Sequence, residues 1–181
     1  MRTSLRRHLR AIGLLPGVVT LVVPAALIYF TGAVNIGWGL PPPANWLPPL
    51  LGCLLIGLGL FLMYQTISLF ATVGEGTLAS WDPPRNLVVR GVYRYVRNPM
   101  ISGVLFILLG EAALLGSLPL LVWFLIFFAA NAIYFPLSEE KGLERRFGDE
   151  YLAYKRNVPR WIPRLRPWRP GLGDRRRDRP G

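Results

Sequence analysis

The sequence predicts an all-α integral membrane protein with about four transmembrane helices in two hairpins, followed by a cytosolic C-terminal helix and tail. Three observations support this fold class. Of the 181 residues, 52% are hydrophobic and only 17% are charged, and the mean hydropathy is +0.35. No residue between Ala11 and Gly74 is charged. The net charge of +11 is concentrated at the two ends of the chain and in one loop.

This basic charge has two interpretations. In a soluble protein it would favour nucleic-acid binding. Because the arginines here flank apolar segments, they instead favour a basic protein face against anionic lipid. We therefore expect membrane lipid, and no nucleic acid, as a partner.

Residues 1–74 are predicted to form the first hairpin. Its spans lie at about Ile12–Thr31 and Leu47–Phe70. Each span has the roughly 20 residues that a helix needs to cross a bilayer core. Pro16 and Pro24 are expected to bend the first span, which membrane helices tolerate when neighbours satisfy the freed carbonyl groups.

The first ten residues carry four arginines and precede an apolar run, as in a signal peptide. The apolar run is too long for a typical signal-peptide core, and no convincing cleavage site follows it. We predict an uncleaved first span, with a twin-arginine export signal as the alternative.

Residues 75–165 contain the second hairpin and the candidate chemistry. Pro99 disfavours helix at Asn98, so a new helix is expected to begin at Pro99. The chain is apolar from Met100 to Leu137 apart from Glu111 and a tight break at residues 116–119. Glu111 lies near the far end of its span, where a carboxylate is either functional or simply hydrated.

A C-terminal helix is predicted from about Ser138 to Asn157, with Ser138 as its N-cap. Glu139 and Glu140 would suit the positive end of its dipole. Val158 and the proline after it should end the helix. Residues 166–181 are predicted to form a disordered basic tail.

The arginines also predict the topology. The N-terminus, the 75–99 loop and the tail are rich in arginine, whereas residues 32–46 and 116–119 have no Lys or Arg. The positive-inside rule then places both termini and the 75–99 loop in the cytosol, with four spans between them. Arginine usage and the absence of targeting signals favour a prokaryotic cytoplasmic membrane.

Three polar elements are expected to meet on the cytosolic face: Tyr93–Pro99, Glu139 with Glu140, and Arg156–Arg164. A glutamate can hold an ammonium group, an arginine can bind a carboxylate through two parallel hydrogen bonds, and a tyrosine can lie near a sulfonium. The alternative without a ligand is that the arginines only determine the membrane topology and the glutamates only cap a helix.

Other kinds of site find no support in the sequence. Cys53 and His8 are the only cysteine and histidine, so a Cys/His zinc site is excluded and no metal is expected. No glycine-rich phosphate loop follows a strand pattern. The sequence assigns no residue to catalysis itself.

The C-terminal half, from residue 85 to 165, resembles the isoprenylcysteine carboxyl methyltransferase and phospholipid methyltransferase family of integral membrane enzymes. Several motifs in order carry the resemblance: residues 91–99 (GVYRYVRNP), Gly103, Glu139-Glu140, the run from Phe147 to Tyr154, and Val158-Pro159-Arg160 with Pro163. The resemblance implies S-adenosylmethionine as cofactor and a lipophilic small molecule or lipidated molecule as acceptor. It points to nine cofactor-binding residues: Leu87, Val88, Tyr93, Arg97, Asn98, Pro99, Glu139, Glu140 and Arg160.

One departure from the family concerns the chemistry. The family usually has a histidine where this chain has Asn98, and asparagine cannot exchange a proton near neutral pH. A carboxylate or thiolate acceptor needs no general base, whereas an amine acceptor does. The sequence therefore favours a lipophilic acceptor of the first kind that enters between the spans.

Two other functions remain open. The chain could be a non-catalytic membrane binding or scaffold protein that retains the fold, with Asn98 marking lost activity. It could also be an enzyme like the sterol reductases, although that family is longer and this chain has no obvious room for a nicotinamide dinucleotide.

Overall fold

The structure is a computed structural model that describes residues 13–73, 87 and 89–169. Every regular element in these residues is helical, which confirms the all-α class. The longer helices are η1 (Gly13–Val22), α2 (Val23–Thr31), α3 (Leu47–Val73), α4 (Pro99–Leu115), α5 (Leu118–Tyr134) and α6 (Glu140–Asn157). Shorter helical turns are η2 (Ala44–Trp46), η3 (Gly91–Arg94) and η4 (Phe135–Glu139).

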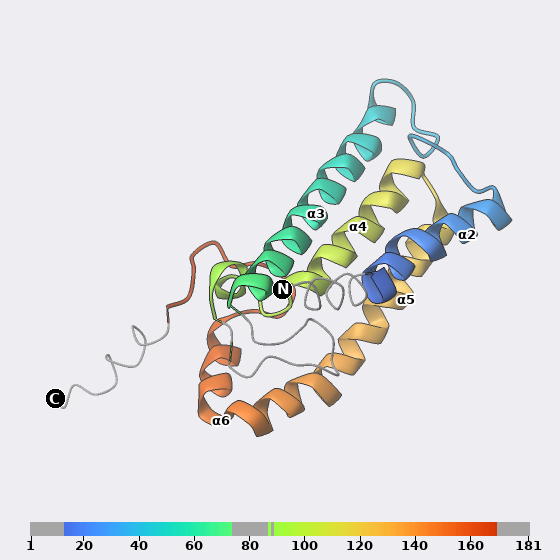
Figure 1. Ribbon diagram of the computed structural model, residues 1–181. Coiled ribbons are helices and arrows are strands. Elements are labelled where there is room, and N and C mark those ends of the chain that lie inside the picture. The colour runs from blue at the N-terminus through green and yellow to red at the C-terminus, as the bar shows by residue number, and fades with distance from the viewer. Residues whose placement is uncertain (1–12, 74–86, 88, 170–181) are drawn as a thin grey trace.

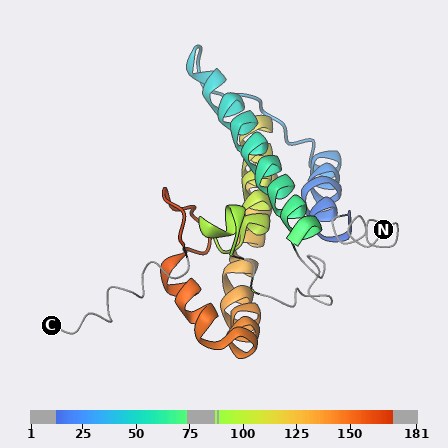
Figure 2. The same cartoon turned by 60° about the vertical axis from the view of Figure 1, so that its left-hand side comes forward.

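In the bundle α3 packs against α4, α4 against α5 and α5 against α2, so α3 and α2 lie on opposite sides of the other two helices (Figure 1). Residues 32–46 join α2 to α3, and the turn at Gly116 joins α4 to α5. Both connections lie at the same end of the bundle, where the Trp38 indole N–H donates to the Ala113 carbonyl at 3.2 Å. At the opposite end lie η3, α6 and residues 158–169, and we call this the polar end (Figures 1 and 2). The bundle therefore separates an apolar region from one polar end.

The helix boundaries follow from local chemistry. Pro99 stands in the first turn of α4, where its missing N–H costs no hydrogen bond. Gly116 ends α4 in the left-handed region, at φ 61°, and its N–H donates to the Ala112 carbonyl. Both boundaries were predicted from the sequence and are confirmed.

The first span contains the expected prolines and is not a uniform α-helix. Residues 13–22, which include Pro16, are π-helical. Pro24 has no N–H to donate to the carbonyl groups one turn before it. The Trp123 indole on α5 instead donates to the Val19 carbonyl at 3.1 Å. A neighbouring helix thus satisfies a carbonyl group that a proline-containing span leaves open.

Glycines bring the backbones of α3 and α4 into direct contact. A Cβ on Gly59 would lie 2.6 Å from the Gly103 carbonyl oxygen, and one on Gly52 would lie 2.7 Å from that of Gly110. The glycines are seven residues apart on each helix, so the two contacts repeat every two turns along the same faces. Small residues are the usual means of close helix packing within membranes.

Two helices are long and apolar enough to cross a membrane, Ala44–Leu69 and Leu118–Asn157. Only 17% and 11% of their most apolar windows are buried inside the protein, which is low for the core helices of a soluble domain. Pro16–Thr31 and Pro99–Leu115 are shorter apolar helices at the positions of the predicted first and third spans. The count of four spans stays a prediction.

The predicted C-terminal helix differs from the structure at its start. Ser138 is not an N-cap, because the helix of α5 continues through the π-helical turn η4 directly into α6. Glu139 and Glu140 therefore meet no free helix N-terminus. The sequence misled here because Ser138 precedes acidic residues, as an N-cap does, while backbone bonding from Phe135 to Glu140 keeps the helix unbroken.

The same helix also breaks within its predicted length. Gly148 has φ 52° and ψ −130°, a conformation that favours glycine, and there α6 changes direction. In a straight helix Lys155 would lie about 16 Å beyond Glu144. Instead the Lys155 ammonium is 2.6 Å from the Glu144 carboxylate, because the second half of α6 folds back.

We expect Gly59→Ala to destabilise the protein by about 1–3 kcal/mol, because the new methyl group would press on the Gly103 carbonyl and force α3 and α4 apart. Thermal unfolding in detergent measures this effect. Gly57→Ala is the matched control on the same helix, since a Cβ there meets nothing within 4 Å. Equal melting temperatures for the two variants would contradict the glycine contact.

Candidate functional site

The polar end is built from a loop and a second segment that run beside each other. We call residues 158–169 the strap. Four backbone hydrogen bonds join it to residues 94–98, between the N–H and carbonyl groups of Arg97 and Pro159 (2.9 Å), Asn98 and Arg160 (3.3 Å), Arg164 and Tyr95 (3.0 Å), and Trp168 and Arg94 (2.9 Å). The three prolines of the strap prevent a helix, so its polar backbone groups pair with the loop instead.

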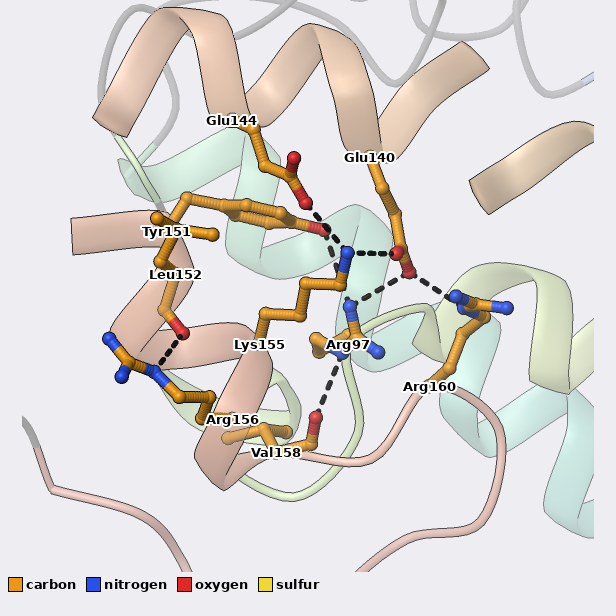
Figure 3. A network of polar contacts seen from close by, with 9 residues as sticks. All are labelled: Arg97, Glu140, Glu144, Tyr151, Leu152, Lys155, Arg156, Val158 and Arg160. Carbon is orange, nitrogen blue, oxygen red and sulfur yellow. Dashed lines mark hydrogen bonds and ion pairs between the residues drawn. The ribbon is translucent and has the colours of Figure 1, made fainter. Parts of the chain in front are cut away.

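Glu140 is the centre of this end (Figure 3). Its carboxylate is 3% exposed and lies at the start of α6. Oxygen Oε1 accepts hydrogen bonds from Arg97 Nη1 at 2.8 Å and from Arg160 Nε at 2.6 Å. Oxygen Oε2 lies 3.1 Å from the Lys155 ammonium. One buried carboxylate therefore holds cations from the loop, the strap and the second half of α6.

The charges of these partners control the ionisation of Glu140. Burial alone would raise the pKa of its carboxyl group. Hydrogen bonds from Arg160 and Lys155, together with the charges of Arg97 and Arg160, outweigh burial and lower the pKa below its ordinary value. Glu140 is therefore ionised at neutral pH and balances part of the surrounding positive charge.

Arg97 is fixed on several sides. Its Nε donates to the Val158 carbonyl at 2.8 Å, and its Nη1 contacts both Glu140 and, at 3.4 Å, the Tyr151 hydroxyl. The Tyr154 hydroxyl donates to the Tyr93 carbonyl at 2.7 Å. Tyr151, Tyr154 and Val158 form a small buried cluster, against which Leu87, Val89, Leu143, Phe147 and Trp168 pack.

Several predicted site residues thus belong to the framework of the polar end. Arg97 and Glu140 pair with each other, Pro99 is buried in the first turn of α4, and Leu87 packs on the tyrosine cluster. These residues hold the loop, strap and α6 together. Val88 lies outside the described residues.

Glu139 has a different environment from its neighbour. Its side chain is half-buried and accepts no hydrogen bond from the residues that the structure describes. Burial raises the pKa of its carboxyl group. Its charge in turn raises the pKa of Tyr93, after the larger effect of that tyrosine's own burial, so the two side chains are near each other.

Asn98 and Arg160 also keep hydrogen-bonding capacity. The Asn98 side chain is half-buried and makes no hydrogen bond within the described residues, because only its backbone bonds to the strap and to Ser102. Arg160 uses Nε for Glu140, and its terminal nitrogens bond to none of the described residues. Glu139, Asn98 and Arg160 therefore keep polar atoms that no described residue bonds.

Two contributors were missed by reasoning from the sequence. Lys155 reaches Glu140 only because α6 turns back at Gly148, which no local pattern indicated. The Ser102 hydroxyl donates to the Trp161 carbonyl at 3.2 Å and so fixes the strap against α4. Within the described part of the chain, no group of three or more metal-binding side chains occurs.

Glu140→Gln should lower the free energy of unfolding by about 3–5 kcal/mol, because it leaves the guanidinium groups of Arg97 (9% exposed) and Arg160 (23% exposed) without a counter-charge in a buried position. Denaturant or thermal unfolding in detergent measures the loss. Glu144→Gln is the matched control: Glu144 is 31% exposed and pairs only with Lys155, so its loss should cost at most about 1 kcal/mol. Equal losses in both variants would contradict a central role for Glu140.

The two adjacent glutamates should give stability opposite dependences on pH. Because the pKa of Glu140 in the folded protein lies below its ordinary value of 4.5, the Glu140 carboxylate stabilises the fold above pH 4.5. This contribution is lost as the pH falls below 4.5. The raised pKa of Glu139 has the reverse sign, so stability declines as pH rises from 4.5 through its folded-state pKa.

Unfolding measured across the acid range tests this pair. Glu140→Gln should remove the loss of stability below the ordinary pKa, and Glu139→Gln should remove the decline above it. Identical pH profiles for both variants and the unaltered protein would show that neither carboxyl group titrates as its surroundings require.

Comparison with known proteins identifies a family. A family model described as phospholipid methyltransferase matches residues 48–150, which is more than half of the chain. The matched region contains α3 to α5, the 91–99 loop and both glutamates, and it ends in α6 before the strap. No curated protein and no solved structure matches the chain. The two long apolar helices and the match to this family together indicate a membrane protein. The chain belongs to the phospholipid methyltransferase family.

Proposed function

We propose that this protein is an integral membrane methyltransferase that uses S-adenosylmethionine to methylate a lipid or another lipophilic acceptor. Family membership supports methyl transfer and a lipid acceptor in general. The observation that carries the cofactor assignment is the half-buried Glu139 carboxylate, which no described residue neutralises. A half-buried carboxylate without a partner is costly, and a cationic ligand would offset that cost.

The free polar atoms of the site fit the charged groups of the cofactor. Glu139 would hold the ammonium group, and the terminal nitrogens of Arg160 would hold the carboxylate. Asn98 offers both a donor and an acceptor. Tyr93, beside Glu139, would lie near the sulfonium or the adenine. Arg97, Glu140, Pro99 and Leu87 would act indirectly, by keeping these groups in place.

The proposed topology has four spans, with both termini and the site in the cytosol of a prokaryotic cell. The site then lies on the side where the cofactor is made available. The division of the chain into a first hairpin (1–74), a catalytic region (75–165) and a basic tail (166–181) belongs to the same proposal. Residues 166–169 of that tail are ordered, because they belong to the strap, where the Trp168 N–H donates to the Arg94 carbonyl.

The bound cofactor supplies an electrophilic methyl group. The protein contributes by holding the acceptor in line with that group and by excluding water. Asn98 cannot accept a proton at neutral pH, and the only histidine, His8, lies outside the described residues. This composition favours an acceptor that needs no general base, such as a carboxylate or thiolate, over an ammonium group.

A non-catalytic protein with the same fold is the second candidate, and Asn98 in place of the family histidine is the observation that favours it. Such a protein need not bind the cofactor. A reductase would instead bind a nicotinamide dinucleotide. Binding measurements therefore separate the three functions before any acceptor is identified.

Calorimetric titration of S-adenosylmethionine into the detergent-solubilised protein should show saturable binding, and Glu139→Gln should weaken it by about tenfold or more, which is about 1.4 kcal/mol. Glu150→Gln is the matched control, because Glu150 is an exposed carboxylate on the second half of α6, and binding should not change. A folded protein that binds no S-adenosylmethionine would overturn the proposal. Selective binding of a nicotinamide dinucleotide would favour the reductase.

A further inference from the structure

The strap carries an apolar surface that the protein does not cover. Ile162 is 78% exposed and Leu165 is 99% exposed. The strap is nevertheless held firmly, by backbone bonds to the loop and by the bond from Ser102 to the Trp161 carbonyl. Two large aliphatic side chains that are exposed on an ordered segment indicate a site of contact with an apolar partner.

The position of the strap along the helices identifies that partner. The Trp161 ring contacts Phe135 (5.6 Å between ring centroids) and Phe128 (6.3 Å). Phe128 is seven residues before Phe135, which places it about 10 Å from Phe135 along the helix axis, toward the middle of α5. Ser102 is in the first turn of α4. The strap therefore lies beside the apolar helices rather than beyond their ends, at the level of the first turns of α4 (Figure 2).

The charge of the strap matches one kind of surface. From Tyr151 to Arg169 the chain contains no Asp or Glu, whereas the strap alone carries four arginines. Arg166 and Arg169 are exposed and follow the exposed Leu165. Exposed aliphatic side chains followed closely by exposed arginines are typical of segments that lie in the interface of an anionic membrane.

We propose that the strap is a membrane-interface anchor, in which Ile162 and Leu165 insert among the lipids beside α4 and Arg166 and Arg169 bind anionic headgroups. This inference depends on the chain lying in a bilayer and not on methyl transfer. It would seat the strap, and with it Arg160, at a fixed depth relative to the membrane surface.

A single fluorophore tests the depth of the strap. Cys53 is the only cysteine and is exposed on α3, so Leu165→Cys in a Cys53→Ser background gives one labelled position. Because Leu165 contacts almost nothing, this substitution should not disturb the fold. The labelled protein is reconstituted in vesicles of equal parts phosphatidylcholine and phosphatidylglycerol.

Two reference positions calibrate the signal. The unaltered chain labelled at Cys53 reports lipid contact within the α3 span and confirms insertion in the bilayer. Glu150→Cys in the Cys53→Ser background reports an exposed position on α6. We expect the label at 165 to have blue-shifted emission, quenching by shallow spin-labelled lipids and protection from iodide, unlike the label at 150.

The arginines are tested in the same assay. Replacing phosphatidylglycerol with phosphatidylcholine, or introducing Arg166→Gln with Arg169→Gln, should shift the 165 label toward iodide exposure. Iodide quenching equal to that at position 150, while Cys53 still reports lipid, would overturn the proposal. A label protected from iodide but also from lipid quenchers would overturn it too, because that result indicates a protein partner. Insensitivity to lipid charge would overturn the headgroup contact.

Discussion

The polar end of this protein depends on one carboxylate. Glu140 joins three segments: the loop before α4 through Arg97, the strap through Arg160, and the second half of α6 through Lys155. The described hydrophobic cluster at this end has only three buried residues. Removing one partner from a buried ion network leaves the other charges unpaired, which is costly. The loop, strap and α6 therefore depend on one another for their positions.

That arrangement explains why two adjacent glutamates differ. Successive residues of a helix point about 100° apart, so when Glu140 faces the loop and strap, Glu139 faces a neighbouring direction beside Tyr93. The cations of the framework are used by Glu140, and none reaches Glu139. One glutamate therefore builds the site, and the next has no counter-charge among the residues that the structure describes. The cofactor proposal rests on this difference.

Much of this structure could be predicted from the sequence, because local signals specify it. Pro99 and Gly116 fix the ends of α4, and the uncharged run to Gly74 contains α2 and α3. The continuous helix through Ser138 and the reversal at Gly148 could not be predicted, since both depend on how distant segments pack. For the same reason the motifs indicated Glu139 and Glu140 together without separating their roles.

Asn98 bears on whether the site still binds a ligand. Asparagine is favoured at helix N-caps because its side chain usually accepts a bond from the first turn, yet here the side chain makes no capping bond. Its backbone is already fixed by Arg160 on one side and Ser102 on the other. The amide is thus not needed for the loop or for α4. The Asn98 side chain is half-buried and bonds to none of the described residues, and it lies at the start of an apolar helix. Ligand binding explains these features better than capping does, and binding is a role that needs no titratable group.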